Sequence, residues 1–375
     1  MPLGWVRFRF NSGQPDQIKE LSGYILLPQL FMEIQLLLRI HKLLKERRIK
    51  LGLYRDEKKA LKKIKKKEII TNNSDFNINL LKEAGFIFFH IVNQADLETV
   101  EKVKSEMKDI GTKEIVGIGG GKAIDVAKKV ASDLKIKLVS FPTAPSHDGL
   151  ISKNCSLYIE GKRETMPSVY PSDLIIPLNL WKNSGNLRKS GICDLLSNII
   201  ALQDISLAER KGEKFEDLYK YLSFQATKLI HVEKEKNLAY GLIISGLAME
   251  KTSRYCSGSE HHFERLFAQK IPEKYLHGQI AGTGTLVSAK IYSMFADNFK
   301  KLRFDSNKLF ETIVSEMKKE NLLEFAIEPL KDERFDPEWL KEISQTRQDR
   351  YSIWNEINSA DLDWKSIIEE IKTTS

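Results

Sequence analysis

The stretch Glu114-Ile-Val-Gly-Ile-Gly-Gly-Gly-Lys-Ala-Ile-Asp125 joins a short apolar run to three consecutive glycines and then to an amphipathic segment. The pattern predicts a buried strand, a tight turn and the start of a helix. Amides at a helix N-terminus favour an anion, and glycine lets a phosphate approach the backbone closely. Lys122 and Ala123 exclude the two commonest phosphate loops, because a dinucleotide fingerprint would need glycine at 122 and a Walker loop Ser or Thr at 123. A glycine-rich turn without a ligand is the alternative.

The length of 375 residues predicts roughly two domains, and a hydrophobic content of 42% is ample for both cores. The net charge of +8 is compatible with an acidic partner such as nucleic acid, an anionic membrane or a phosphorylated small molecule. Much of this charge lies in two runs, Lys42–Lys50 and Lys58–Lys67, whose apolar residues recur at helical spacing. We therefore interpret the runs as solvated helix faces.

Cysteine usage and the N-terminus indicate a soluble cytoplasmic protein. Only three cysteines occur, without paired spacing, which favours a reducing compartment. Met1–Phe10 lacks the unbroken apolar core of a signal peptide. Leu21–Ile40 is the most hydrophobic long window, but polar residues interrupt it well short of the ~20 apolar residues of a membrane span, so we expect no stable membrane insertion.

Short apolar runs alternate with helical patterns from about residue 22 to residue 150. This alternation predicts an α/β domain with a parallel sheet, whose ligand lies outside the carboxyl ends of the strands. A second polar turn, Pro142–Gly149, follows the strand after the glycine turn. The expected strands are Ile49–Tyr54, Glu68–Thr71, Phe86–Val92, Ile115–Ile118 and Leu138–Phe141.

Beyond residue 150 the pattern changes twice. Residues 150–190 are irregular and rich in proline, which indicates a crossing between domains, and from Gly191 onwards nearly every segment has helical spacing. We expect a nucleotide-binding α/β domain over residues 1–175 and an all-helical metal- and substrate-binding domain over residues 176–375. The tail from about residue 330 carries three tryptophans among many charges, which predicts a docked helical extension.

Asp194, His261 and His277 are candidate metal ligands. Asp194 is one of few carboxylates within an apolar helical face, where an isolated charge would be costly. Ser257 and Glu260 have capping-box spacing, which places His261 in the first turn of a helix, and His277 precedes Gly278 at another expected helix start. One aspartate and two histidines suit a catalytic zinc with an open position. Histidines that are structural only are the alternative.

Asp148 lies in the segment Ser-His-Asp-Gly. Its neighbours are contiguous, so they do not form a Ser/His/Asp triad, whose members come from separate segments. Asp-Gly is also simply a good turn. A carboxylate beside the glycine turn could instead hydrogen-bond the hydroxyl groups of a small polyol or ketol.

Six segments, taken together, resemble the glycerol-1-phosphate dehydrogenase family. They are Gly119-Gly-Gly-Lys-Ala-Ile-Asp-Val-Ala-Lys128, Pro142-Thr-Ala-Pro-Ser-His-Asp-Gly149, Ser190-Gly-Ile-Cys-Asp194 followed by Gln203-Asp204, Ser257-Gly-Ser-Glu-His261, Leu276-His-Gly278 and Arg347-Gln-Asp-Arg-Tyr-Ser-Ile353. The resemblance implies the fold shared with dehydroquinate synthases and iron-containing alcohol dehydrogenases, with the site in a cleft between an N-terminal nucleotide-binding domain and a C-terminal helical domain.

The resemblance also implies roles for individual residues. Asp194, His261 and His277 would bind zinc and form the catalytic centre, and Asp148 together with Asp194 would hold the substrate. The residues implied to bind the dinucleotide are Gly119, Gly120, Gly121, Lys122, Ala123, Thr143, Ala144, Pro145, Ser146 and Ser152.

The reaction implied is reduction of dihydroxyacetone phosphate to sn-glycerol 1-phosphate, a backbone for membrane phospholipids. Zinc would polarise the carbonyl, and NADPH or NADH would supply the hydride. Two positions depart from the family pattern. Gln279 stands where Glu follows His-Gly, and Arg265 replaces a histidine that contacts substrate. An arginine there could hold the substrate's phosphate through two parallel hydrogen bonds.

Two other functions remain as alternatives. One is another metal-dependent polyol or alcohol dehydrogenase of the same superfamily, and the other is a non-catalytic nucleotide or nucleic-acid binder. We expect no nucleic-acid partner, because a pure binder gives no reason for Asp194, His261 and His277 to occur together. Asn72-Asn73-Ser74 lacks the acidic residue that excludes a 2′-phosphate, which predicts use of both cofactors with a preference for NADPH. The sequence leaves the oligomeric state open, a homo-oligomer included.

Overall fold

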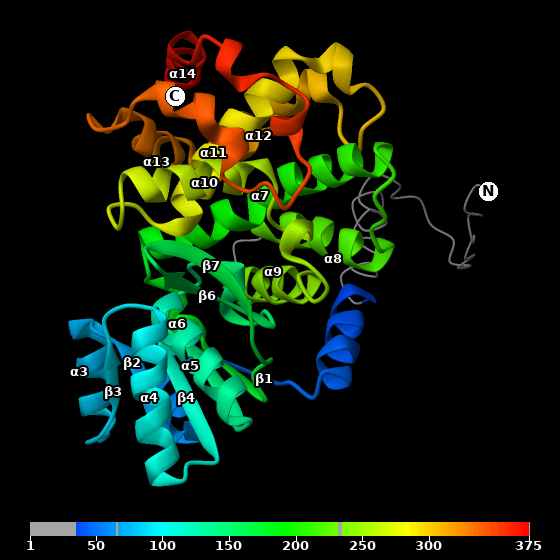
Figure 1. The fold of residues 1–375 in the computed structure, drawn as a ribbon. Coiled ribbons are helices and arrows are strands. Elements are labelled where there is room, and N and C mark those ends of the chain that lie inside the picture. The colour runs from blue at the N-terminus through cyan, green and yellow to red at the C-terminus, as the bar shows by residue number, and fades with distance from the viewer. Residues whose placement is uncertain (1–34, 65–66, 232–234, 375) are drawn as a thin grey trace, which may run out of the picture. The chain divides into compact units, whose positions relative to one another are not determined.

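The computed structural model describes residues 35–64, 67–231 and 235–374 (Figure 1). The chain divides into two compact units, residues 1–47 and 48–375. Residues 35–46 of the first unit are helical. The expectation for Met1–Phe10, and the greater part of the one for Leu21–Ile40, lie outside the described residues.

A six-stranded parallel sheet organises the first part of the unit formed by residues 48–375, as the alternating pattern predicted. The strand order is β1-β8-β5-β4-β2-β3. The strands are β1 (Lys50–Tyr54), β2 (Glu68–Asn72), β3 (His90–Val92), β4 (Glu114–Gly119), β5 (Lys137–Pro142) and β8 (Asp173–Pro177). The central strand β4 is buried along most of its length, because its apolar side chains face helices on both sides of the sheet.

Helices cover both faces of the sheet. Ile70, Ile115 and Leu138 face the core shared with α4 and α5, whereas Ile69, Val116 and Val139 face the core shared with α2 and α3. This alternation follows from the two-residue period of a strand. The helices are α2 (Glu57–Leu61), followed by the 3₁₀ turn η1 (Lys62–Ile64), α3 (Asp75–Glu83), α4 (Leu97–Ile110) and α5 (Gly121–Leu134).

Residues 150–190 hold more regular structure than the sequence predicted. The 3₁₀ turn η2 (Asp148–Leu150) leads into an antiparallel hairpin of β6 (Asn154–Ile159) and β7 (Lys162–Pro167), and β8 then returns to the main sheet between β1 and β5. The prolines concealed β8, because Pro177 stands at its last residue, where a missing amide is tolerated. The expected strand Phe86–Val92 was too long, since only His90–Val92 pairs.

The described residues after β8 form helices and turns, as predicted from Gly191 onwards (Figure 1). The α-helices are α6 (Leu178–Lys182), α7 (Asn186–Arg210), α8 (Asp217–Lys228), α9 (Glu235–Ala248), α10 (Ser259–Lys270), α11 (His277–Met294), α12 (Ser306–Lys319), α13 (Leu323–Ile327) and α14 (Trp364–Lys372). The 3₁₀ turns are η3 (Leu229–His231), η4 (Ser253–Tyr255), η5 (Ala296–Phe299), η6 (Glu328–Lys331), η7 (Pro337–Gln345), η8 (Ile353–Asn355) and η9 (Ser359–Asp361).

The helix α7 is the core element of the helical part. It packs against α8, α10 and α11. Among the described helices it alone is long and apolar enough to span a membrane, but 89% of that apolar window is buried inside the protein. Its hydrophobicity is therefore explained by its place in a core. The tail is docked as predicted, since Trp354 and Trp364 are fully buried.

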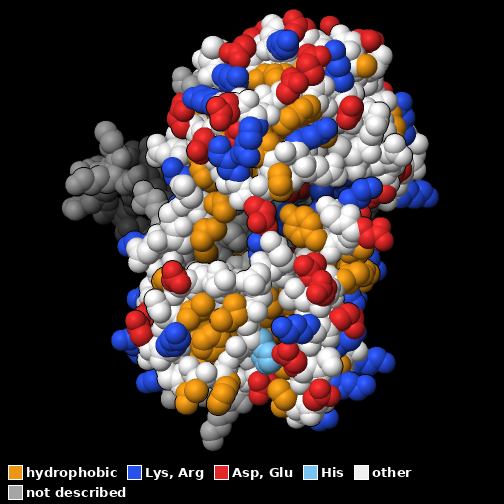
Figure 2. All heavy atoms as spheres, turned by 60° about the vertical axis from the view of Figure 1, so that its left-hand side comes forward, with side chains coloured by type: hydrophobic (Ala, Val, Ile, Leu, Met, Phe, Trp, Pro, Cys, Tyr) orange, Lys and Arg blue, Asp and Glu red, His pale blue; other side chains and the backbone are white. Residues whose placement is uncertain are grey.

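Charged side chains of both signs are interspersed over the face shown in Figure 2. Positive and negative groups alternate there without a continuous basic surface. Within the two basic runs most described lysines are exposed while Leu43, Leu44 and Leu61 are buried, which supports the interpretation of the runs as solvated helix faces.

The carboxylate of Asp204, buried in α7, connects three other segments. Its Oδ1 accepts hydrogen bonds from the Tyr292 hydroxyl of α11 at 2.6 Å and from the Ile353 amide at 3.0 Å. Its Oδ2 accepts the amide of Ser259, the first residue of α10, at 2.5 Å. Burial and the nearby charge of Glu260 raise the pKa of Asp204 to about 6, against the stabilising effect of the Tyr292 hydroxyl.

Asp204→Asn should destabilise the protein by about 2–4 kcal/mol, because an amide nitrogen cannot accept the bonds that a carboxylate oxygen accepts in this buried site. Urea unfolding followed by tryptophan fluorescence measures the change. The matched control is Asp217→Asn on α8, whose side chain is 98% exposed and which should shift the free energy of unfolding by less than about 0.5 kcal/mol. Equal stability of the two variants would show that Asp204 does not connect these segments.

Candidate metal and cofactor site

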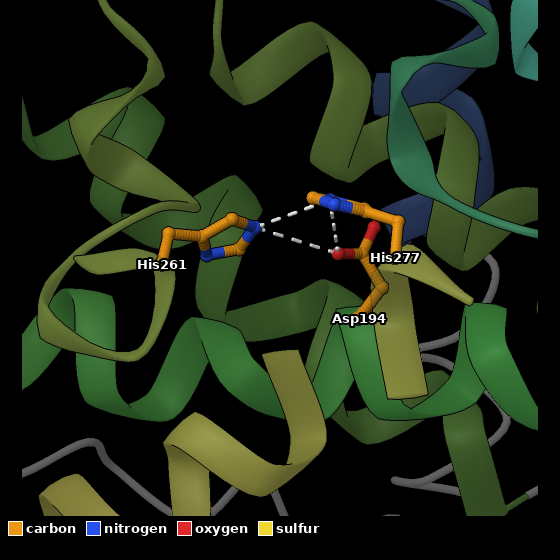
Figure 3. Close-up of side chains that lie close together, drawn as sticks. All are labelled: Asp194, His261 and His277. Atoms are coloured by element: carbon orange, nitrogen blue, oxygen red, sulfur yellow. Dashed lines mark hydrogen bonds and ion pairs between the residues drawn. The ribbon is translucent and has the colours of Figure 1, made fainter. Parts of the chain in front are cut away.

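Three helices each contribute one side chain to a convergent group. Asp194 lies in the buried middle of α7, His261 lies in the first turn of α10, and His277 is the first residue of α11. Figure 3 shows the two imidazole rings approaching each other from opposite sides, with the Asp194 carboxylate beneath them. The sequence predicted each of these helix positions, and the structure brings the three side chains together.

The ligand atoms of this Asp–His–His group all lie within 4.8 Å of one another. The Nε2 atoms of His261 and His277 are 3.3 Å apart, and they lie 3.7 and 3.5 Å from Asp194 Oδ1 (Figure 3). Two nitrogens bound tetrahedrally to zinc stand about 3.3 Å apart. The group therefore has the donor types and nearly the spacing of a three-ligand metal site.

A carboxylate stands behind each histidine ring. Glu260 Oε1 lies 2.8 Å from Nδ1 of His261, and Glu264 Oε1 lies 3.0 Å from Nδ1 of His277. Arg163 of β7 fixes the second carboxylate through an ion pair of 3.1 Å. Carboxylates in this position hold the ring proton on Nδ1 and leave Nε2 as a lone pair. With both ring protons on Nδ1, the two Nε2 lone pairs face one point, where a cation would bind them.

Burial controls the charges of the group. Burial lowers the pKa of His261 to about 3 and also lowers the pKa of His277, so both rings are neutral, which is the form that binds metal. Burial, together with the charge of Asp148, raises the pKa of Asp194 well above its usual range. For Glu264, burial acts in the same direction, but His277 and Arg163 outweigh it and hold its pKa well below the usual value.

Asp148 orients the aspartate of the group. The backbone amide of Asp148 donates to Asp194 Oδ2 at 2.8 Å, which leaves Oδ1 facing the histidines. The Ser245 hydroxyl donates to Asp148 Oδ2 at 2.6 Å. The Asp148 side chain also lines a small cavity of about 90 Å³ beside His261 and His277, which we call the inner cavity. Asp148 therefore lies beside the Asp–His–His group, and its contact with substrate stays a prediction.

The glycine turn connects the end of β4 to the start of α5. Gly119 has φ +133°, and a Cβ there would stand 2.0 Å from Asn72 Oδ1, so both conformation and space require glycine. A Cβ on Gly120 would meet no atom within 4 Å. Gly120, Gly121 and Lys122 line a second cavity of about 450 Å³, the glycine-turn cavity, which shares His147 and His277 with the inner cavity.

The predicted dinucleotide residues divide into two sets. Gly120, Gly121, Lys122 and Ser146 line the glycine-turn cavity. The others lie behind its wall: Gly119 and Ala123 in the strand and helix core, Thr143, Ala144 and Pro145 in the turn after β5, and Ser152, which lines the inner cavity and is hydrogen-bonded to Lys128. Thr143 joins the two turns through a bond from its amide to Gly119 O at 3.1 Å.

The two departures from the family pattern have different surroundings. Gln279 points away from the site, since its Nε2 donates to Phe325 O and to Glu328. Arg265 lines the inner cavity, but its guanidinium also donates to Arg163 O and to Thr165 Oγ1 of the hairpin. The change at 279 therefore concerns helix packing, whereas the change at 265 lies at the site.

The expected capping box at Ser257 was wrong. Helix α10 begins at Ser259 with Gly258 as its cap, and Glu260 Oε1 accepts the Gly258 amide at 2.6 Å. Because Asp204 takes the Ser259 amide, the helix needs no cap from Ser257. The Ser257 hydroxyl instead accepts a hydrogen bond from Arg347.

Several site residues were missed from the sequence. Glu260 and Glu264 flank His261 on one helix, and their spacing could have suggested a supporting role. His147 was considered only as a member of a contiguous triplet, yet its ring packs edge-on against His277 at 6.1 Å. Arg163 gave no signal, because it reaches the site only through the hairpin.

Comparison with known proteins agrees with the fold. Residues 79–184 match the family model described as iron-containing alcohol dehydrogenase. The fold matches the crystal structure of a probable glycerol dehydrogenase from Sinorhizobium meliloti with a TM-score of 0.64, over 86% of this chain and 96% of that one, at 17% identity. The fold is therefore of the iron-containing alcohol dehydrogenase type.

Similar sequences identify the family within this class of fold. The chain is 34% identical to glycerol-1-phosphate dehydrogenase [NAD(P)+] of Metallosphaera sedula, over 60% of this chain and 67% of the relative. It is 31% identical to the enzyme of the same name from Pyrococcus horikoshii, over 60% of this chain and 68% of the relative. The chain belongs to the glycerol-1-phosphate dehydrogenase family, and it is an NAD(P)-dependent oxidoreductase.

Glu264→Gln should weaken metal binding about 10- to 100-fold, because the amide cannot hold the His277 proton on Nδ1 as a carboxylate does. Competition with a chromophoric chelator measures the zinc affinity. Glu311→Gln on the exposed face of α12 is the control and should bind zinc as the wild type does. An unchanged affinity in Glu264→Gln would mean that the carboxylate only packs against the ring.

Proposed function

We propose that this protein reduces dihydroxyacetone phosphate to sn-glycerol 1-phosphate with NADPH or NADH, and that zinc held by Asp194, His261 and His277 takes part. The observation that carries the proposal is the adjacency of the two cavities. His277 belongs to the Asp–His–His group and also lines the glycine-turn cavity. A cofactor in one cavity and a carbonyl in the other would meet at this histidine.

The residues around the inner cavity support this reaction. A divalent zinc bound there acts as a Lewis acid that polarises the carbonyl and stabilises negative charge on its oxygen. Asp148 lines the same cavity and is positioned to accept a hydrogen bond from a substrate hydroxyl. The carboxylates of Glu260 and Glu264 keep both Nε2 atoms directed at one point. The chain thus supplies orientation and charge, and the cofactor supplies the hydride.

The cofactor residues follow from the same arrangement. Gly120 and Gly121 present the N-terminus of α5 to the glycine-turn cavity, which suits a pyrophosphate. Asn72 and Asn73 line this cavity and carry no charge that would exclude a 2′-phosphate, so NADPH and NADH are both accepted, with a preference for NADPH. The further contributors are Gly119, Lys122, Ala123, Thr143, Ala144, Pro145, Ser146 and Ser152. In this proposal residues 1–175 hold the cofactor and residues 176–375 the metal and substrate, with Arg265 contacting the substrate.

The product would serve membrane phospholipid synthesis in the cytoplasm. A metal-dependent polyol dehydrogenase of the same superfamily is the competing enzyme, and a panel of phosphorylated and free substrates separates the two. A non-catalytic nucleic-acid binder would show strongly salt-dependent binding to nucleic acid and no bound metal.

The decisive measurement follows nicotinamide absorbance with dihydroxyacetone phosphate. We expect turnover with both cofactors, loss of turnover after removal of metal by a chelator, recovery on adding zinc, and no turnover of free dihydroxyacetone. His261→Ala should lower kcat/KM at least about 100-fold, because it removes a metal ligand. His90→Ala on β3, remote from the site, is the control. No turnover with either cofactor in the zinc-loaded protein would refute the proposal, and a large preference for NADH would refute the cofactor assignment.

Gly120→Ala tests where the cofactor binds. Its φ of −87° suits alanine and the new methyl group meets no protein atom, so the free energy of unfolding should change by less than about 0.5 kcal/mol. The methyl group would occupy the space proposed for the pyrophosphate, so the Kd for NADPH should rise at least about tenfold, as measured by fluorescence titration. Unchanged NADPH affinity in this variant would place the cofactor elsewhere.

A further inference from the structure

Arginines gather in the wall of the inner cavity. Arg163, Arg265 and Arg347 all line the inner cavity. The same three side chains line a larger hollow of about 800 Å³, which we call the outer basin. Arg265 and Arg347 do not line the glycine-turn cavity, so they mark the side opposite the expected cofactor.

The outer basin is positively charged. Its wall holds seven lysines and arginines against three aspartates and glutamates. A cationic hollow with walls of low dielectric raises the local concentration of small anions and speeds their arrival. The part of the basin that touches the inner cavity is therefore suited to an anionic group.

Arg347 makes the fewest hydrogen bonds and ion pairs of the arginines that line both the inner cavity and the outer basin. Among the described side chains it makes one side-chain hydrogen bond, from Nη1 to Ser257 Oγ at 2.9 Å, and no ion pair. Four of its five N–H donors are thus available in a half-buried site. Burial, together with the charges of Arg350 and Arg265, lowers the pKa of Arg347 to about 9.

The neighbouring arginines already form ion pairs or hydrogen bonds within the protein. Arg163 is paired with Glu264, and Arg265 is bonded to Arg163 O and Thr165 of the hairpin. Arg350 is paired with Asp349 and donates to Ser257 O at 2.9 Å, which holds the Ser257 backbone in place beside Arg347. The positive charge of Arg347 is the one that lacks an anionic partner within this cluster.

We propose that Arg347, with Arg265 beside it, binds the phosphate group of the substrate. This inference rests on the proposed function, in that it takes the substrate to be a phosphorylated ketone. The phosphate lies at the arginine end of the inner cavity, and the carbonyl lies at the Asp–His–His end. Guanidinium and phosphate match in shape and form parallel charge-assisted hydrogen bonds, which neutral ketones cannot offer.

The assignment predicts selectivity that a structural arginine would not give. Arg347→Gln should raise the KM for dihydroxyacetone phosphate about 10- to 100-fold with a smaller change in kcat, because a charge-assisted bond to the non-reacting end of the substrate is lost. The Kd for NADPH and the melting temperature should stay unchanged. Arg347→Lys should raise the KM less than Arg347→Gln does, since lysine keeps the positive charge but cannot form two parallel hydrogen bonds to the phosphate. Arg334→Gln is the matched control, because Arg334 is exposed and does not line the basin.

Binding of inorganic phosphate, measured by titration calorimetry on the zinc-loaded protein without cofactor, separates this inference from the proposed function. We expect wild type and Arg334→Gln to bind phosphate and Arg347→Gln to bind it at least about tenfold more weakly. Phosphate binding that depends on Arg347, without reduction of dihydroxyacetone phosphate, would uphold the subsite and refute the proposed function. Reduction of dihydroxyacetone phosphate with an unchanged KM in Arg347→Gln would refute the subsite and uphold the function.

Discussion

The buried carboxylate of Asp204 is the constraint on which the arrangement of the helical part depends. It lies on α7, only ten residues after Asp194, and it accepts hydrogen bonds from the start of α10, from α11 and from the segment that follows Arg350. A carboxylate without these donors would be costly inside a protein, so the three segments must close around it. His261 is fixed as a consequence, because the amide of Ser259 can reach Asp204 only when α10 begins at that residue. The same carboxylate sets the register of the C-terminal segment that carries Arg347.

The site contains two groups whose charge or lone pairs have no partner among the described residues. One is the Asp–His–His group and the other is Arg347. Behind the histidines, Glu260 and Glu264 each hold one ring through Oε1, and Arg163 is paired with Glu264. The two Nε2 atoms and one oxygen of Asp194 converge on a single point. A cation at that point would bind all three atoms. At the other end of the inner cavity, Arg347 carries a positive charge with no anionic partner among the described residues. A molecule with a polarisable carbonyl at one end and a phosphate at the other satisfies both demands at once.

The sequence was sufficient for features that depend on local spacing. The alternation of apolar runs predicted the parallel sheet. Local spacing also placed Asp194 in an apolar helical face and His261 and His277 at helix starts, where the structure has them. The sequence was insufficient where long-range contacts decide the conformation. Strand β8 was hidden by prolines at its boundaries, and the first amide of α10, that of Ser259, is hydrogen-bonded by Asp204, more than fifty residues away. The hairpin that carries Arg163 meets the site only in three dimensions, so no spacing in the sequence could reveal it.

The contacts of Arg265 show what changes physically when arginine stands where the family pattern has a histidine. Arginine at this position donates to the backbone of β7 and lies 3.8 Å from Glu264, so it ties the hairpin to the α10 helix that carries His261. A histidine is too short and has too few donors to make these contacts together. The change therefore exchanges the family's histidine for a positively charged wall, with the hairpin held close to the Asp–His–His group. In the proposed function, recognition of the substrate would then shift from its hydroxyl groups towards its charge, and Asp148 would remain as the carboxylate that distinguishes one hydroxyl pattern from another.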